Sequence, residues 1–241
     1  ARLIERIEKI PHVCYAEPFI GMGGVFLRRR LRPPGEVIND RAGDVANLFR
    51  VLQRHPQALL AELELGLTSR VEFLRHRRVE PSTLTDVERA ARFFYLQQIV
   101  FGGQPHGTFG TSALRPARFD LGRLRPLLAA VHRRLRAVTI EALDFQAFIE
   151  RYDRPTTLFY ADPPYWGCES DYGPNLFSRA DFERLAAVLH RLKGRFILSI
   201  NDRPEIRQVF AGFRIEAVGV TYRANGVKHV RELIISNRRR R

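Results

Sequence analysis

The sequence predicts an α/β fold whose sheet is doubly wound and mostly parallel, with an antiparallel hairpin at its C-terminal end. Short apolar runs alternate with segments of helical periodicity, which is the pattern of strand–helix–strand units. Near the C-terminus, β-rich runs at residues 213–222 and 230–237 flank Asn225-Gly226, a dipeptide that favours a tight hairpin turn. We expect about seven strands, five in the alternating part and two in the hairpin.

The composition is that of a globular protein. Of the 241 residues, 45% are hydrophobic, and no apolar run approaches the ~20 residues of a membrane-spanning helix. Only two cysteines occur, which excludes a disulfide framework and a zinc site and predicts a reducing compartment. The first ten residues have the pattern of a short amphipathic helix rather than a secretory signal. We therefore expect a cytoplasmic protein with no membrane partner and no metal.

The net charge of +14 indicates a polyanionic partner, most simply nucleic acid. Lysine occurs only at Lys9, Lys193 and Lys228, so nearly all of the positive charge is arginine. Arginine suits bidentate contacts to phosphate and guanine. A biased genome would give the same usage, so a merely basic globular protein remains the alternative at this point.

A glycine-rich turn follows the first predicted strand. The strand covers residues 13–17, the turn covers residues 18–24, and an apolar-basic helix is expected from residue 25. Such a unit binds nucleotides because glycines let the backbone approach a ligand closely and the helix N-terminus offers free N–H groups. The spacing is not the complete dinucleotide fingerprint, so the motif is weak by itself.

The second predicted strand, residues 36–40, ends in an acid. Asp40 follows Gly21 by about 20 residues, which is where a doubly wound fold places the carboxylate that binds a ribose diol. The alternative is that Asp40 only caps the predicted helix of residues 41–53. The preceding glycine-rich turn favours ribose binding.

The alternation of strands and helices is lost over residues 54–134, which we interpret as an inserted lobe. Segments at residues 55–66 and 84–101 have helical periodicity. The glycine-rich, aromatic segment of residues 101–110 predicts a hairpin or an exposed loop.

The sheet is predicted to resume at residues 136–140, and Asp144 and Phe145 lie at the exit of this strand. A carboxylate and an aromatic ring in this place could hold an adenine by its amino group and its face. A helix N-cap and a core phenylalanine explain the same spacing equally well. The residues alone do not separate the two alternatives.

The most informative stretch is Asp162-Pro163-Pro164-Tyr165, which ends the apolar, aromatic strand predicted at residues 157–161. Two prolines remove two N–H donors and fix φ, so the chain must leave the sheet as a rigid turn. A carboxylate, a free carbonyl and an aromatic ring are then held where open α/β sheets bind ligands. The two acceptors suit an amine on a flat ring that stacks on Tyr165, and they free its lone pair for attack on an electrophile. An ordinary turn is the alternative.

The remaining chain completes the pattern. Residues 166–174 predict a mobile flap, residues 181–192 a helix capped by Ser178, and residues 195–200 another strand. The C-terminal arginines are expected to form a solvated charge run.

Ten short motifs recur together in one known family. In chain order they are Glu17-Pro-Phe-Ile-Gly-Met-Gly-Gly24, Ile38-Asn-Asp-Arg41, Asn47-Leu-Phe-Arg-Val-Leu-Gln53, Phe94-Tyr-Leu-Gln97, Phe101-Gly-Gly103, Phe109-Gly110, Asp144-Phe145, Phe159-Tyr-Ala-Asp-Pro-Pro-Tyr165, Phe196-Ile-Leu-Ser199 and Glu232-Leu-Ile-Ile-Ser-Asn237. With this set the sequence resembles the DNA adenine-N6 methyltransferases of the GATC-methylase type, particularly their phage-borne relatives. The similarity keeps the order of the motifs and runs nearly from end to end.

The resemblance implies the Rossmann-like sheet of class I methyltransferases and S-adenosylmethionine as the cofactor. Residues 1–53 and 135–241 would form the catalytic, cofactor-binding domain, and residues 54–134 the inserted target-recognition lobe. Gly21 and Gly23 would line the methionine end of the cofactor, and Asp40 would bind its ribose. The implied cofactor-binding residues are Glu17, Pro18, Phe19, Gly21, Gly23, Asp40, Asp144, Phe145 and Asp162.

The resemblance also implies methyl transfer to adenine N6 in duplex DNA. The adenine would flip out of the duplex at a cost of a few kcal/mol, and catalysis would rest mainly on positioning. Asp162 would orient the amine, with the Pro163 carbonyl as a second acceptor and Tyr165 stacked on the base. The implied catalytic residues are Asp162, Pro163, Pro164 and Tyr165, and the implied DNA contacts are Gly102, Gly103, His106, Tyr165 and Trp166.

Two departures from the family pattern limit these expectations. No Gly-Gly-Lys segment precedes the first helix, so either this segment is trimmed or the cofactor site is incomplete. Gln104-Pro105-His106 replaces the Arg-Tyr-Asn pattern of the GATC enzymes, so their target sequence does not carry over. We expect double-stranded DNA and a restriction endonuclease as partners of a monomer or weak dimer in a bacterial or phage setting. The alternative is a non-catalytic nucleic-acid-binding protein that retains the fold.

Overall fold

The computed structural model describes residues 2–64, 66–100, 107–110, 114, 116–169, 173, 176–222 and 228–237. The chain forms two compact units, of which the first combines Ala1–Arg41 with Val138–Arg241 and the second is Ala42–Ala137. The second unit therefore begins before the insertion that the sequence predicts at residue 54. Its role as a target-recognition lobe stays a prediction.

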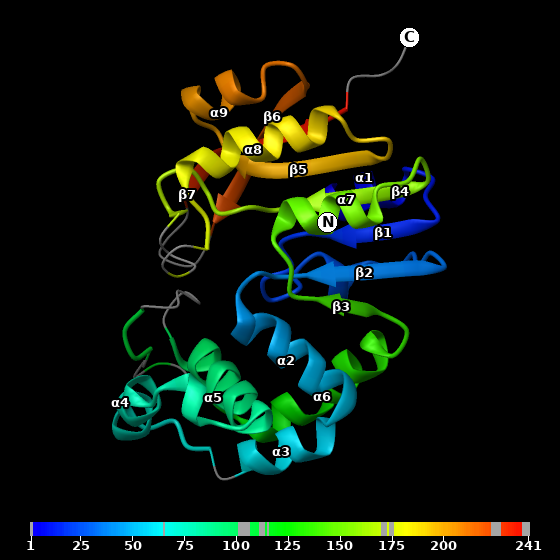
Figure 1. Cartoon of the computed structure of the whole chain (residues 1–241). Coiled ribbons are helices and arrows are strands. Elements are labelled where there is room, and N and C mark those ends of the chain that lie inside the picture. Colours follow the sequence, from blue (N-terminus) through cyan, green and yellow to red (C-terminus); the bar gives the residue numbers. More distant parts are fainter. Residues whose placement is uncertain are drawn as a thin grey trace. The chain divides into compact units, whose positions relative to one another are not determined.

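One seven-stranded sheet forms the centre of the first unit, in the order β3-β2-β1-β4-β5-β7-β6 (Figure 1). The strands β1 to β5 run parallel, whereas β7 is antiparallel to both β5 and β6. The predicted fold class, a mostly parallel α/β sheet with an antiparallel C-terminal pair, is confirmed. The strands are β1 (Cys14–Glu17), β2 (Gly35–Asn39), β3 (Thr139–Glu141), β4 (Thr157–Ala161), β5 (Arg195–Asn201), β6 (Arg214–Tyr222) and β7 (Lys228–Ser236).

The strand order changes direction between β1 and β4, which lie side by side in the middle of the sheet. Their register pairs Ala16 with Phe159. The loops that follow these two strands therefore emerge next to each other at the carboxyl edge. Open α/β sheets bind ligands at such a switch point.

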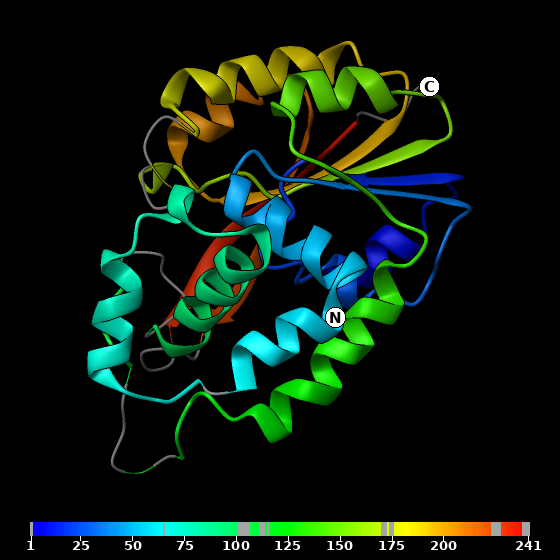
Figure 2. The same cartoon turned by 60° about the horizontal axis from the view of Figure 1, so that its bottom comes forward.

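Helices cover both faces of the sheet in the first unit (Figure 2). α7 and α8 lie side by side on one face, and α1 lies on the other. The core between the sheet and α7 and α8 is rich in phenylalanine, including the fully buried Phe148, Phe159, Phe182 and Phe196. The helices are α1 (Arg2–Glu8), η1 (Phe26–Arg28), α7 (Phe145–Tyr152), α8 (Arg179–His190) and α9 (Pro204–Val209).

The helix predicted from residue 25 is wrong: only the short 3-10 turn η1 forms there. The chain then runs without helix or strand to β2, and Pro33-Pro34 cannot supply the N–H groups that a continuing helix needs. Glu8 instead accepts the backbone N–H groups of Arg30 and Leu31, at 2.6 and 3.0 Å. The glycine-rich turn is therefore not followed by a helix N-terminus.

The second unit is mainly helical, as the sequence predicts for its insertion. α2 packs against α3, α5 and α6, and α5 begins with a capping box between Thr85 and Glu88. α4 and α6 are not apparent from the sequence, because α4 buries only Phe73 and α6 has Pro126 in its interior. The helices are α2 (Gly43–Arg54), α3 (Pro56–Glu64), α4 (Arg70–Arg78), η2 (Pro81–Thr83), α5 (Asp86–Ile99) and α6 (Leu121–Leu135).

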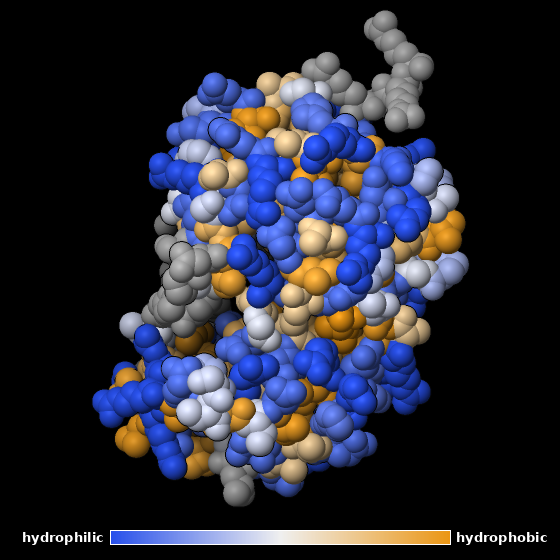
Figure 3. All heavy atoms as spheres, in the orientation of Figure 1, coloured by the Kyte–Doolittle hydropathy of each residue, from blue (hydrophilic) through white to orange (hydrophobic). Residues whose placement is uncertain are grey.

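The surface of α4 combines charge and apolar area. Its last turn carries Arg75, His76, Arg77 and Arg78, while Val71 and Leu74 are exposed. Figure 3 shows hydrophilic and hydrophobic residues side by side in this part of the second unit. Among the described residues, no helix is long and apolar enough to cross a membrane.

Candidate active site

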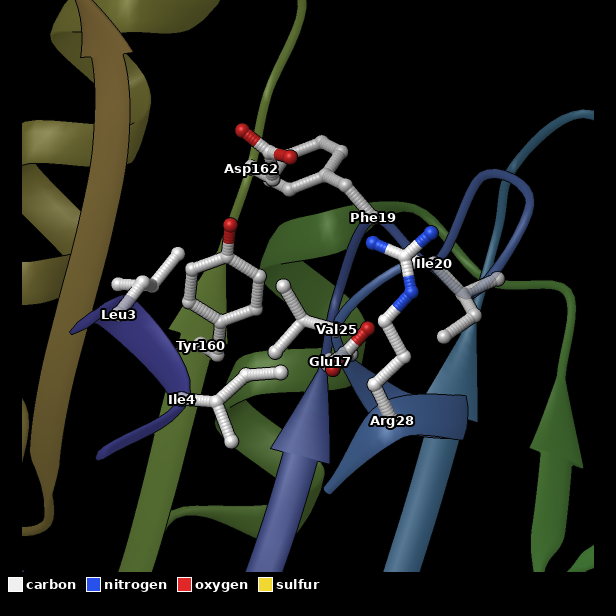
Figure 4. A pocket seen from close by; sticks show the side chains of 10 residues that line it. Leu3, Ile4, Glu17, Phe19, Ile20, Val25, Arg28, Tyr160 and Asp162 are labelled. Atoms are coloured by element: carbon white, nitrogen blue, oxygen red, sulfur yellow. The ribbon is translucent and has the colours of Figure 1, made fainter. Parts of the chain in front are cut away.

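A cavity of ≈ 280 Å³ opens in the first unit where β1 and β4 end (Figure 4). Its walls come from α1, the turn after β1, η1 and the end of β4. Figure 4 shows the Tyr160 hydroxyl pointing toward the Asp162 carboxylate. The lining residues are Leu3, Ile4, Glu17, Phe19, Ile20, Gly24, Val25, Arg28, Tyr160 and Asp162.

The turn after β1 has a backbone that requires glycine. Gly21 and Gly23 have φ values of 48° and 72°, in the left-handed region that other residues rarely adopt. The Gly21 N–H donates to Asp40 Oδ2 at 2.9 Å, so the acid that follows β2 holds the turn in place. The N-cap of α2 is Ala42, which makes no side-chain cap. Asp40 is therefore not the N-cap residue of α2.

Glu17 places a buried carboxylate at the end of β1. It is 1% exposed and accepts a short hydrogen bond from the Tyr15 hydroxyl. Burial raises the pKa of Tyr15 well above its usual value, which keeps this hydroxyl a donor. The Arg29 guanidinium lies 3.4 Å from the centroid of the Tyr15 ring, and it also pairs with the Glu36 carboxylate at 3.3 Å.

Asp162 follows β4 directly and is held by the neighbouring strand. The Ser199 hydroxyl on β5 donates to Asp162 Oδ1 at 2.9 Å and lies 2.7 Å from the Tyr160 hydroxyl. Asp162 keeps an exposed surface that a ligand can reach, yet the protein atoms packed around its carboxyl limit hydration. This desolvation raises the pKa of Asp162 to about 6, which the Ser199 hydrogen bond opposes and the negative charge of Glu232 reinforces.

The rest of the motif is anchored to β5 and β7. Pro163 and Pro164 are buried, and the Tyr165 hydroxyl donates to Glu232 Oε1 at 2.6 Å. The Trp166 N–H donates to Asn201 Oδ1 at 2.9 Å, and Asn201 Nδ2 donates to the Trp166 carbonyl at 3.0 Å. These contacts tie the motif to two strands of the sheet.

Asp144 and Phe145 have the structural roles that the sequence left open. Asp144 caps α7 by accepting the Gln146 N–H at 3.0 Å, and it binds Arg184 through two hydrogen bonds of 2.9 Å. Burial is the largest single influence on the pKa of Asp144 and raises it, but the hydrogen bonds from Arg184 and the Gln146 N–H, together with the charges of Arg184 and Arg41, lower the pKa overall. Phe145 is 2% exposed, and its ring centroid lies 5.5 Å from that of Phe19 in the cavity wall.

The structure thus brings Glu17, Phe19 and Asp162 to one cavity and places Asp40 behind the adjoining turn. The predicted DNA contacts Gly102, Gly103 and His106 lie outside the described residues. Four functional candidates that sequence reasoning missed are Tyr160, Ser199, Asn201 and Glu232. A polar side chain within an otherwise apolar strand was the available signal for Tyr160, Ser199 and Asn201, whereas Glu232 lies in a strand with several charged residues and had no such signal.

The family model for D12 class N6 adenine-specific DNA methyltransferases matches residues 2–224. The chain belongs to this family. The predicted family and activity, a site-specific DNA adenine methyltransferase, are confirmed, so the protein uses a methyl donor and acts on DNA. The mostly parallel sheet with its antiparallel C-terminal pair is consistent with a Rossmann-like methyltransferase.

Curated relatives of this methyltransferase agree with the assignment. The chain is 26% identical to the type II methyltransferase M1.LlaDCHI of Lactococcus lactis subsp. cremoris, over 95% of this chain and 90% of the relative. It is 27% identical to the DNA N-6-adenine-methyltransferase of Escherichia phage P1, over 83% of this chain but 28% of that longer protein. It is 23% identical to the type II methyltransferase M.CviBI of Paramecium bursaria Chlorella virus NC1A, over 85% of this chain and 80% of the relative.

Proposed function

We propose that this methyltransferase uses S-adenosylmethionine to methylate N6 of an adenine flipped out of duplex DNA, with Asp162 orienting the target amine. The observation that carries the proposal is the Asp162 carboxylate, fixed by Ser199 at the mouth of the cavity with Tyr165 close behind it in the chain. A flat base with an exocyclic amine needs a carboxylate at its edge and an aromatic ring at its face. The motif supplies both.

The residues around the cavity suit S-adenosylmethionine. Glu17 and Asp162 offer negative charge for its cationic centre, and Arg28 offers positive charge for its carboxylate. The cavity of ≈ 280 Å³ is at the lower limit of ligand pockets, ~300 Å³, so we assign the rest of the cofactor to the adjoining turn. There, Gly21 faces open space, since a Cβ at this position would meet no atom within 4 Å, so the cofactor can come close to the Gly21 backbone. Asp40 would bind the ribose hydroxyls.

Asp144 and Phe145 are proposed to hold the adenine of the cofactor. The Asp144 carboxylate can accept about four hydrogen bonds, and three come from Gln146 and Arg184. The fourth position faces Arg41, whose Nη1 lies 3.6 Å from Asp144 Oδ2, so an adenine amino group would bind there beside the Arg41 guanidinium. Glu17, Pro18, Phe19 and Gly23 complete the proposed cofactor residues, and Phe19 links the cavity wall to Phe145.

When bound, S-adenosylmethionine supplies an electrophilic methyl group on a sulfonium. The protein's part is to present the amine. The ionised Asp162 carboxylate accepts one N–H of the target amine and the Pro163 carbonyl accepts the other, so the nitrogen lone pair is withdrawn from the ring. Tyr165 stacks on the base. The methylated nitrogen loses its proton late, to Asp162 or to water.

We propose duplex DNA as the substrate. The target base must then be extruded from the double helix to reach this site. The net charge of +14 supports DNA as the partner. We assign target recognition to the second unit, with Trp166 and residues 102, 103 and 106 contacting the DNA. We further propose a monomer or weak dimer in a bacterial or phage-infected cytoplasm, with a restriction endonuclease as partner. The type II names of two relatives support only the endonuclease partner.

The proposal is tested by incubating the protein with tritium-labelled S-adenosylmethionine and unmethylated plasmid DNA. Equilibrium dialysis measures cofactor binding in parallel, so that a failure of binding is separated from a failure of transfer. We expect binding of the cofactor and label in N6-methyldeoxyadenosine. Label in cytosine or in an RNA control would contradict the target, and the absence of both binding and label would support a non-catalytic binder.

A further inference from the structure

Three polar side chains on one face of the β5–β7 pair hold the segment from Asp162 to Trp166. Ser199 and Asn201 are two residues apart on β5 and therefore point to the same side. Glu232 on β7 is the register partner of Asn201, which puts its side chain next to that of Asn201. Ser199 contacts Asp162, Glu232 contacts Tyr165, and Asn201 contacts the Trp166 backbone. We call Ser199, Asn201 and Glu232 the clasp.

The clasp contacts are specific for individual groups of the motif. The Asn201 amide pairs with both the N–H and the carbonyl of Trp166, as a neighbouring strand would. This fixes the main chain immediately after Tyr165. The Tyr165 hydroxyl donates to Glu232 Oε1 at 2.6 Å. With its main chain and its hydroxyl both held, the ring of Tyr165 has a set orientation.

The sheet itself does not need these polar side chains. β5 and β7 pair through five residues of backbone register, from Ile197–Ser236 to Asn201–Glu232. Leu233 and Ile235 on β7 are fully buried and supply apolar packing for the same strand. The side chains of Asn201 and Glu232 are directed instead to a loop that is far away in sequence.

We propose that Glu232 and Asn201 are positioning residues that set the Tyr165 ring against the flipped adenine, so that the amine meets Asp162. This inference rests on the proposed function. A ring free to rotate about its Cα–Cβ bond would let the base shift in the site, and displacement of a bound reactant by ~1 Å can cost about 100-fold in rate.

The kinetic test uses Glu232→Ala, Glu232→Gln and Tyr165→Phe with unmethylated plasmid DNA and S-adenosylmethionine. Glu183→Ala, at an exposed site on α8, is the matched control. We expect Glu232→Ala and Tyr165→Phe each to lower kcat about 10-fold or more, with little change in the KM for the cofactor. Glu232→Gln keeps an acceptor for Tyr165 and should recover most of the loss. The double variant Glu232→Ala with Tyr165→Phe should be no slower than either single variant, because the two substitutions remove the same contact.

A second measurement needs neither activity nor cofactor. Trp166 is the only tryptophan of the sequence, so its fluorescence reports on this segment directly. We expect Asn201→Ala to increase the quenching of Trp166 by acrylamide at least twofold, whereas Glu183→Ala leaves it unchanged. If the wild-type protein does not methylate adenine, the proposed function fails, and this quenching still decides whether the clasp holds the segment.

Wild-type kcat in both Glu232→Ala and Tyr165→Phe would overturn the positioning role. Wild-type quenching in a folded Asn201→Ala variant would do so as well. Equal losses in Glu232→Ala and Glu232→Gln would show that the charge of Glu232, rather than the hydrogen bond to Tyr165, is what matters.

Discussion

The Ser199 hydroxyl donates a 2.9 Å hydrogen bond to Asp162 Oδ1, which ties the proposed catalytic carboxylate to the neighbouring strand β5. The register of the two strands pairs Ala161 with Leu198, so Asp162 and Ser199 come next along each strand. Ser199 in turn lies 2.7 Å from the hydroxyl of the buried Tyr160. The orientation of Asp162 is therefore set by the sheet, and the loop that contains it contributes only part of the geometry.

The pH dependence of kcat/KM should move in opposite directions in two variants. The ionised Asp162 is the active form, so the rate falls as the pH drops through its pKa of about 6. Ser199→Ala removes a hydrogen bond that lowers this pKa, so the acid limb should move to higher pH. Glu232→Gln removes a negative charge that raises this pKa, so the limb should move to lower pH. Initial rates between about pH 5 and 8 measure both shifts, and movement in one common direction would refute the assignment of the limb to Asp162.

Asp40→Ala should weaken cofactor binding about 10-fold or more, because it removes both the proposed ribose ligand and the acceptor for the Gly21 N–H. Asp202→Ala is the control, since Asp202 also follows a strand but pairs with Arg207 at 2.7 and 2.8 Å. Equilibrium dialysis with S-adenosylmethionine measures the affinity. Unchanged affinity in Asp40→Ala would exclude the ribose assignment.

The ion pair between Arg6 and Glu216 should matter more for the cavity than for stability. Arg6 on α1 binds Glu216 on β6 at 2.9 and 2.5 Å, and α1 contributes Leu3 and Ile4 to the cavity wall. The pair is partly exposed, so Arg6→Ala should lower the free energy of unfolding by no more than about 1 kcal/mol. Cofactor affinity should fall measurably and be restored in part by the swap Arg6→Glu with Glu216→Arg. A loss of stability without a loss of cofactor affinity would show that α1 does not form part of the cofactor site.

The sequence predicted the parts of the site that local chemistry determines. The strand at residues 157–161 has the predicted bounds, because an apolar run closed by two prolines leaves little freedom at its end. The glycine-rich turn after β1 and the acid at Asp40 were likewise predicted from their spacing, although the left-handed φ values and the Gly21–Asp40 hydrogen bond were not. These features depend on residues close together in the chain.

The parts that sequence reasoning missed depend on pairing between distant segments. Glu232 contacts Tyr165 only because β7 inserts between β5 and β6 in a register that places Glu232 opposite Asn201. The predicted helix after the glycine-rich turn failed for a related reason, since Glu8 on α1 binds the backbone there in its place. For Asp144, the spacing indicated the N-cap role, whereas its pairing with Arg184 on the distant helix α8 could not be predicted.

The central claim is that Asp162 orients the amine of an adenine for methylation. Its most direct test compares wild-type protein with Asp162→Ala for tritium transfer from S-adenosylmethionine to unmethylated plasmid DNA, with nucleoside analysis of the product and filter binding of the same DNA. We predict label in N6-methyldeoxyadenosine for the wild type, loss of transfer by at least about 100-fold in the variant, and nearly unchanged DNA binding. Transfer to adenine at a wild-type rate by Asp162→Ala would contradict the account.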